Sequence, residues 1–180
     1  MEEHHCITLF NYLGIDSEKI PLCVETGTHR GWGTEQWAKL FKKVITIELS
    51  AELFSYCTDT YDLPNVNFLQ GSSHDVLSDI IGDINEKYFL FLDAHGSGGD
   101  TTYDESVGRF GAPVLKEIQA VSDNPPEILV LDDLSDFNNI SSYPSPEEIH
   151  KEVSKIGEYS SSVFNEGAFT KGALIFDRRK

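Results

Sequence analysis

The chain has 180 residues, of which 39% are hydrophobic and 24% charged, and its formal net charge at pH 7 is −16. These values are typical of a folded globular protein and exclude global disorder. Because a strongly acidic surface repels phosphate backbones and anionic lipid, neither nucleic acid nor a membrane is an expected partner.

The cysteine content and the absence of long apolar segments indicate a compartment. Cys6, Cys23 and Cys57 are an odd number without CxxC spacing, which is typical of reduced thiols. No apolar segment approaches the length of a bilayer span, and the N-terminus lacks the pattern of a signal peptide. We therefore expect a soluble, cytoplasmic protein, and a two-fold homodimer is the default expectation for its assembly.

Short apolar segments alternate with amphipathic ones along most of the chain. In chain order the predicted elements are a helical segment (1–19), a strand (20–26), a helix (34–43), a strand (43–49), a helix (50–61), a strand (65–71), a helix (73–84), a strand (87–95), a helix (112–122), a strand (126–134), a helix (145–160) and two strands joined by a loop (161–179).

This alternation predicts the α/β class. Apolar strands separated by helices favour a Rossmann-like, doubly wound, mostly parallel sheet of seven strands with helices on both faces. The last two strands would form an antiparallel hairpin, with an edge strand inserted the other way. No linker or repeat divides the chain, so we expect a single domain over residues 1–180. Ligands of such sheets bind at the carboxyl ends of the strands.

The segment "VETGTHRGWGT", residues 24–34, follows the first predicted strand. Glycines at 27, 31 and 33 permit positive φ and let a ligand approach the backbone. Their spacing differs from the GxGxxG pattern of dinucleotide sites, where a pyrophosphate lies on a helix N-terminus. An acid two residues before the first glycine, Glu25, disfavours a pyrophosphate and favours a cation. The pattern indicates a turn around a positively charged ligand, and the alternative is a tight turn without one.

Polar residues also end the second and third predicted strands. The carboxylate of Glu48 can accept hydrogen bonds from both hydroxyls of a ribose. Ser72 and Ser73 follow the third strand, where an adenine edge would lie. A cation, a ribose and an adenine together describe S-adenosylmethionine better than a dinucleotide.

In order and spacing, the segments "VETGTHRGWGT", "VITIEL", "NVNFLQGSSHDVL", "YFLFLDAH" and "EILVLDDL" resemble the class I S-adenosylmethionine-dependent methyltransferases. The resemblance covers most of residues 20–135, and the C-terminal hairpin is similar to the family's sixth and seventh strands. Ser72 stands where many members have an Asp on the adenine amino group. The residues to which the resemblance implies cofactor contacts are Glu25, Gly27, Thr28, Gly31, Gly33, Thr34, Glu48, Ser72, Ser73 and Asp93.

Acidic side chains follow the fourth and fifth predicted strands, which open on the same edge of the sheet. Converging carboxylates repel one another unless they are protonated or bridged by a cation, and such oxygen clusters suit Mg²⁺, Ca²⁺ or Mn²⁺. A resemblance to metal-dependent O-methyltransferases implies that Asp93, Asp132 and Asp133 are metal ligands. The alternative is that these residues only form turns or cap a helix.

Methyl transfer to a hydroxyl requires that the hydroxyl proton be removed. Asp93 and His95 are the candidate catalytic residues, and an imidazole titrates close enough to neutral pH to act as a general base. A metal-ligating or structural role for His95 stays open. The segment 95–111 contains five glycines and a single basic residue, Arg109, and we predict that it is a mobile lid over the substrate.

These observations lead to one hypothesis and two alternatives. The hypothesis is an S-adenosylmethionine-dependent O-methyltransferase that acts on a small hydroxylated molecule such as a sugar, assisted by a divalent metal. One alternative is a non-catalytic domain of the same fold that binds a cofactor or a partner. The other is an NAD-dependent oxidoreductase, against which the glycine spacing and Glu25 argue.

Overall fold

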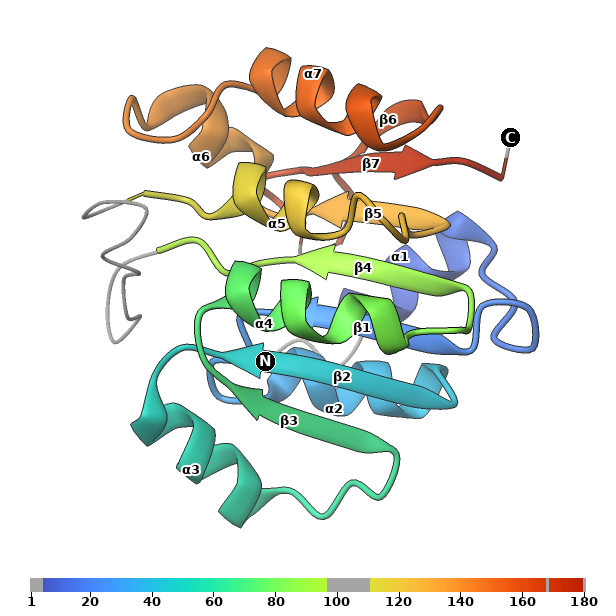
Figure 1. The fold of residues 1–180 in the computed structure, drawn as a ribbon, viewed down its shortest axis with the longest axis vertical. Coiled ribbons are helices and arrows are strands. Elements are labelled where there is room, and N and C mark those ends of the chain that lie inside the picture. The colour runs from blue at the N-terminus through green and yellow to red at the C-terminus, as the bar shows by residue number, and fades with distance from the viewer. Residues whose placement is uncertain (1–4, 97–110, 168, 180) are drawn as a thin grey trace.

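The computed structural model describes residues 5–96, 111–167 and 169–179 (Figure 1). The lid predicted over 95–111 lies almost wholly outside these residues. The described residues form one seven-stranded sheet in the order β3-β2-β1-β4-β5-β7-β6. Its strands are β1 (Leu22–Thr26), β2 (Lys43–Glu48), β3 (Val66–Gln70), β4 (Tyr88–Leu92), β5 (Ile128–Leu131), β6 (Ser160–Phe164) and β7 (Ala173–Asp177).

The sheet confirms the predicted fold class and refines the place of the reversed strand. Strands β1 to β5 are parallel, and β7 runs antiparallel to both β5 and β6. The reversed strand is therefore not the edge strand that the sequence suggested, because β7 lies inside the sheet and β6 forms the edge. The chain extends the sheet outward from β1 to β3 and then returns to add β4 on the other side of β1. This change of direction between β1 and β4 is the place where α/β sheets bind their ligands.

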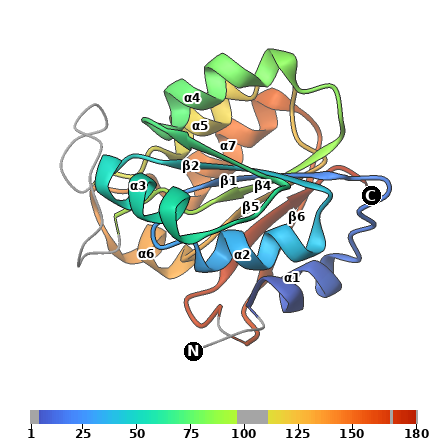
Figure 2. The same ribbon diagram turned by 90° about the horizontal axis from the view of Figure 1, so that it is seen from below.

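Helices cover both faces of the sheet. They are α1 (His5–Leu13), α2 (Trp32–Leu40), α3 (Ala51–Thr60), α4 (Ser73–Ile80), α5 (Val114–Ala120), α6 (Leu134–Asn139) and α7 (Pro146–Ile156), with a short 3₁₀ helix η1 (Ile81–Asp83). Helices α4, α5 and α7 lie on one face, and α1 and α2 lie on the other (Figure 2). Helix α6 was not predicted, and among the described helices none combines the length and apolar character needed to cross a bilayer.

The helix predicted over 145–160 is shorter in the structure, because a capping box marks its start and a glycine follows its last residue. Ser145 and Glu148 form a reciprocal capping box at the start, and a proline occupies the first turn. Gly157 follows the last residue of α7. The chain beyond it is extended, so Ser160 belongs to β6 rather than to the helix.

Successive residues of each central strand face opposite helical layers. In β1, Leu22 and Val24 pack in the core beneath α4, α5 and α7, whereas Cys23 packs beneath α1 and α2. All five residues of β1 are buried. Because side chains alternate along a strand, Glu25 points to the same face as Cys23 and lies under α2. The alternation of side chains along β1 therefore sets the environment of Glu25, the acid that precedes the glycine turn.

Candidate functional site

The turn between β1 and α2 closes directly onto the end of β4. Gly27 has φ +83°, a conformation that glycine adopts readily, and its N–H donates to the carbonyl of Ile47 at 2.9 Å. A Cβ at this position would lie 2.3 Å from the carbonyl oxygen of Asp93. The glycine is therefore required both for the backbone angle and for the close approach of two strand ends. The approach fixes the turn beside Asp93, where the fourth strand ends.

The other two glycines of the turn also meet side chains at close range. Gly31 has φ +78° and is the N-cap of α2, and an added Cβ would lie 2.6 Å from the ring of Tyr61. A Cβ on Gly33 would lie 2.9 Å from Oε1 of Glu25. With no side chain at the N-cap, the first amides of α2 are left to other acceptors, and such a helix end favours a carboxylate.

Glu25 is buried between β2 and α2 with 3% of its surface exposed. Its Oε2 accepts hydrogen bonds from the hydroxyls of Thr34 at 2.5 Å and Thr46 at 2.7 Å. Burial raises the pKa of Glu25 to about 7, although these two hydrogen bonds oppose the rise. Thr28, also buried, shares a hydrogen bond with Thr46 at 2.6 Å. The carboxyl group of Glu25 thus links β2 to α2 beside the glycine turn. A direct contact with a cofactor amine stays a prediction.

Glu48 ends β2, and its carboxylate binds two backbone segments, the glycine turn after β1 and the start of α3. Its Oε2 accepts from the N–H of His29 at 2.7 Å, and its Oε1 accepts from the N–H of Ser50 at 2.8 Å. Since each carboxylate oxygen can accept two hydrogen bonds, both oxygens keep capacity for a ligand hydroxyl. His29 has a positive φ of 50° inside the glycine turn. Glu48 therefore ties the turn to the strand whose end is the predicted ribose position.

The predicted adenine residues begin α4. Ser72 is the N-cap, and its hydroxyl lies 2.9 Å from Nδ1 of His74. Ser73 is buried in the first turn of the helix. The imidazole of His74, which sequence reasoning did not single out, therefore competes with any ligand for the Ser72 hydroxyl. The adenine contacts of both serines stay predictions.

His95 lies buried between two carboxylates, with its side chain 2% exposed. Its Nε2 is 3.5 Å from Oδ2 of Asp133, and its Nδ1 is 3.8 Å from Oδ1 of Asp93. Nδ1 has no hydrogen-bond partner among the described residues. The rings of Phe137 and Tyr143 contact the imidazole edge-on, at centroid distances of 5.4 Å and 6.0 Å. The structure brings together the two predicted catalytic residues and orients the imidazole by packing.

The pKa of Asp93 is raised, first by desolvation and then by repulsion from Asp132 and Asp133. The Asp93 side chain is 39% exposed, so solvent weakens both the desolvation and the repulsion. Asp132 is buried, and its Oδ1 accepts from the N–H of Asp133 at 2.8 Å. The acids that end β4 and β5 therefore lie close enough to influence one another, as the sequence predicted.

A lysine that sequence reasoning missed reaches this cluster from the segment before β7. Nζ of Lys171 lies 2.8 Å from Oδ2 of Asp133 and 2.8 Å from Oδ2 of Asp136. Burial acts to raise the pKa of Asp133, but hydrogen bonds from His95 and Lys171 outweigh it and lower the pKa. Asp136 also escaped prediction, although its spacing of three residues from Asp133 would have marked it once a helix over 134–139 was recognised.

In the part of the chain that the structure describes, only one of the three predicted metal ligands, Asp133, belongs to a group of side chains close enough to share a metal ion. Among the described residues, the group whose ligand atoms lie within 4.8 Å of one another is His95, Asp133 and Asp136, without Asp93 or Asp132. Its donors are of the kind that Mg²⁺ and Mn²⁺ accept. However, the ammonium of Lys171 already pairs with both carboxylates, so the group as it stands does not fit a divalent ion. A metal on Asp93, Asp132 and Asp133 stays a prediction.

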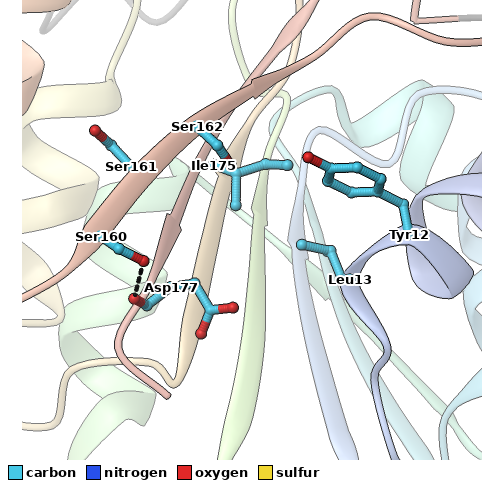
Figure 3. Close-up of a pocket in the computed structure, with 7 residues that line it drawn as sticks. All are labelled: Tyr12, Leu13, Ser160, Ser161, Ser162, Ile175 and Asp177. Atoms are coloured by element: carbon cyan, nitrogen blue, oxygen red, sulfur yellow. Dashed lines mark hydrogen bonds between the residues drawn. The ribbon is translucent and has the colours of Figure 1, made fainter. Parts of the chain in front are cut away.

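A pocket of about 390 Å³ lies elsewhere, between α1 and the edge of the sheet (Figure 3). Tyr12 and Leu13 of α1 line one side of it, facing residues of β6 and β7. Ser160 begins β6 and Asp177 ends the antiparallel β7, so the pocket opens at the amino ends of the parallel strands. The candidate site lies at their carboxyl ends, and none of its predicted residues lines this pocket.

Comparisons with known proteins show the fold. No family model matches the chain, and no curated protein sequence matches it. Among solved structures, it is similar to CalS10, an amino pentose methyltransferase from Micromonospora echinaspora, at 13% identity with a TM-score of 0.66 over 99% of this chain and 92% of that one. It is similar to the O-methyltransferase TomG from Streptomyces achromogenes at 12% identity with a TM-score of 0.65, over 95% and 77%.

Spermidine synthase from Thermotoga maritima matches at 12% identity with a TM-score of 0.60, over 89% of this chain and 54% of that one. The structures of CalS10 and TomG contain bound S-adenosylmethionine. At such low identities the similarity establishes that this chain has the fold of the S-adenosylmethionine-dependent methyltransferases, as its sequence motifs predicted.

Proposed function

We propose that this protein is an S-adenosylmethionine-dependent O-methyltransferase that acts on a small hydroxylated molecule. One observation carries the proposal: the glycine turn after β1 is closed onto the end of β4, beside a buried His95 that is held between two carboxylates. A cofactor loop and a proton acceptor therefore share one edge of the sheet, at its change of strand direction. Methyl transfer to a hydroxyl needs both.

The cofactor would lie along the ends of β1, β2 and β3. The uncapped start of α2 suits the carboxylate of the methionine part. The unused capacity of the Glu48 carboxylate suits the ribose hydroxyls, and the segment around Ser72 suits the adenine. When bound, the cofactor supplies an electrophilic methyl group on a positively charged sulfur. The proximity of Asp93, Asp132 and Asp133 beside the turn supports a cationic ligand, since a positive charge there relieves the repulsion among the carboxylates.

His95 would act as the general base. In its neutral form one ring nitrogen carries a proton and the other accepts one. Donation from Nε2 toward Asp133 leaves the partnerless Nδ1 as the acceptor, and Nδ1 faces Asp93 at the end of β4. As the oxygen–methyl bond forms and the methyl–sulfur bond breaks, the acceptor hydroxyl would release its proton to the Asp93 carboxyl, whose side chain is 39% exposed, and through it to the buried Nδ1. The Asp93 carboxyl would then stabilise the positive charge that the imidazole gains.

Two finer parts of the hypothesis concern the acceptor and a metal. A sugar acceptor is supported by the similarity to CalS10, which acts on an amino pentose. Assistance by Mg²⁺, Ca²⁺ or Mn²⁺ is supported by the mutual repulsion of Asp93, Asp132 and Asp133. The ion pair of Lys171 opposes a metal at Asp133, so the catalytic steps above use only residues of the chain.

The first experiment is calorimetry with S-adenosylmethionine, its demethylated product and NAD. We expect both sulfur nucleosides to bind and NAD to give no heat. No binding of either sulfur nucleoside at about millimolar concentration would refute the proposal, since such a ligand would gain less than about 4 kcal/mol. Binding of NAD alone would favour the oxidoreductase.

The second experiment tests the base with His95→Gln and the control His150→Gln, an exposed histidine on α7. Turnover is measured as formation of S-adenosylhomocysteine in the presence of a panel of monosaccharides and amino sugars. We expect His95→Gln to lower kcat by about 10²–10⁴-fold and to leave cofactor affinity unchanged. Equal activity in both variants would remove His95 from the chemistry. Cofactor binding without turnover on any acceptor would favour the non-catalytic alternative.

A further inference from the structure

Three side chains beside the proposed base form a group with the composition of a metal site. His95 contributes an imidazole, Asp133 and Asp136 contribute carboxylates, and their ligand atoms lie within 4.8 Å of one another. Two negative charges at this separation, partly shielded from water, need a nearby positive charge. The side chains of Asp133 and Asp136 are 25% and 19% exposed, so water alone supplies only part of that compensation.

The positive charge comes from the chain itself. Nζ of Lys171 contacts one oxygen of each carboxylate at 2.8 Å, and the oxygen that it contacts on Asp133 is the same one that faces His95. Ion pairs with both acids raise the pKa of Lys171, although burial acts to lower it. The ammonium thus occupies the position from which a divalent ion would reach these carboxylates.

Lys171 is held there by the backbone rather than by its side chain alone. The N–H of Ser135 donates to the carbonyl of Lys171 at 2.9 Å, and the N–H of Leu134 donates to the carbonyl of Gly172 at 2.8 Å. Gly172 itself has φ +77°, which turns the chain into β7. These contacts join the segment before β7 to the first turn of α6, the element that carries Asp136. The backbone of Lys171 is therefore tied to the helix that carries Asp136.

We propose that Lys171 is the resident cation of this cluster and excludes divalent metal from His95, Asp133 and Asp136 in the native protein. The exclusion is a property of the folded chain and stands independently of the reaction. One consequence does rest on the proposed function: the proton transfer at His95 would not require a metal on Asp133. Lys171 would instead be a positioning residue, because it fixes the carboxylate that faces Nε2.

The test is a titration of the full chain with Mn²⁺. Binding is measured by calorimetry and by the electron paramagnetic resonance signal of free Mn²⁺. The variants are Lys171→Ala and Lys171→Arg, with Lys155→Ala as the control for loss of a surface lysine that pairs with a single glutamate. We expect Lys171→Ala to bind Mn²⁺ at least about tenfold more tightly than the wild type, because removal of the ammonium frees two carboxylates. Lys171→Arg and Lys155→Ala should behave as the wild type does.

A second substitution locates the ion. Adding Asp136→Asn to Lys171→Ala should abolish the gain in Mn²⁺ affinity. A folded Lys171→Ala variant with no gain would overturn the proposal. The proposal would also be overturned if the wild type binds Mn²⁺ and the single substitution Asp136→Asn abolishes that binding. This comparison of the wild type with Asp136→Asn tests the proposal even if Lys171→Ala fails to fold. Failure of the methyltransferase proposal would appear separately, as absent binding of S-adenosylmethionine, and would leave the Mn²⁺ result valid.

Discussion

Replacing Gly27 by alanine tests whether the glycine turn is built around contact with β4. The new Cβ would lie 2.3 Å from the carbonyl oxygen of Asp93 and 3.0 Å from the N–H nitrogen of Ala94, both of them backbone atoms that cannot rotate away. The left-handed backbone costs about 1–2 kcal/mol for a residue with a Cβ. Relieving the overlap by moving the strand ends apart costs a further 1–3 kcal/mol or so. The variant should therefore lose roughly 2–5 kcal/mol of unfolding free energy.

The matched control is Gly14→Ala. Gly14 also has a left-handed φ of +56°, but an added Cβ there would meet no atom within 4 Å. The control should lose only the backbone cost of about 1–2 kcal/mol. Urea unfolding gives both values, and the melting temperature should fall by roughly 2–4 °C for each kcal/mol in a chain of this size. Cofactor affinity, measured by calorimetry, should fall in Gly27→Ala and stay unchanged in Gly14→Ala.

The comparison between the two variants decides the interpretation. If Gly27→Ala is no less stable than Gly14→Ala, the turn can move away from β4 without cost, and the close approach is not a constraint of the fold. If stability falls as expected but cofactor affinity does not, the turn is structural and the cofactor lies elsewhere.

Three further outcomes follow from individual acids and caps. The pKa of Glu25 is about 7 in the folded chain against an ordinary value of 4.5, so the native state binds more protons and loses up to about 3 kcal/mol as pH rises from 4.5 to 7. Urea unfolding between pH 5 and pH 8 should show a smaller fall in Glu25→Gln, and parallel curves would contradict the burial argument. Glu48→Gln should weaken binding of S-adenosylmethionine at least about tenfold through loss of charged hydrogen bonds, whereas the control Glu52→Gln should not; equal affinities would remove Glu48 from the ribose site. Ser145→Ala should cost about 1 kcal/mol by removing the capping box of α7, with cofactor affinity unchanged, and an unchanged midpoint in urea would show that the cap adds nothing.

The sequence was sufficient for the sheet because apolar periodicity is a local signal. Strands β4 and β5 are continuous apolar runs, and β1, β2 and β3 are mostly apolar with polar residues among them. A helical pattern follows each of the five, so their order predicts a doubly wound sheet. The insertion of β7 between β5 and β6 was not predicted, because strand neighbours depend on how the hairpin docks. Helix α6 was missed for a related reason: "LSDFNN" has little helical periodicity, and its buried Phe137 packs near His95 rather than along a long apolar face.

The site shows the same division. The acids and glycines at the strand ends were visible in the sequence, since each follows an apolar run. The direction of the Glu25 side chain was not visible. Side chains alternate between the two faces of β1, and the position of Glu25 in the strand places its carboxyl group under α2, between Thr34 and Thr46. The partner of Asp133 was hidden as well, since Lys171 lies 38 positions further along the chain.

The amino-acid sequence alone determined which segments become strands and helices, and which chemical groups stand at the carboxyl ends of the strands, because both depend on neighbours along the chain. Only the tertiary structure decided which charges meet. Ion pairs and hydrogen bonds act over a few ångströms, and here the packing of the segment before β7 against α6 sets those distances for Lys171, Asp133 and Asp136.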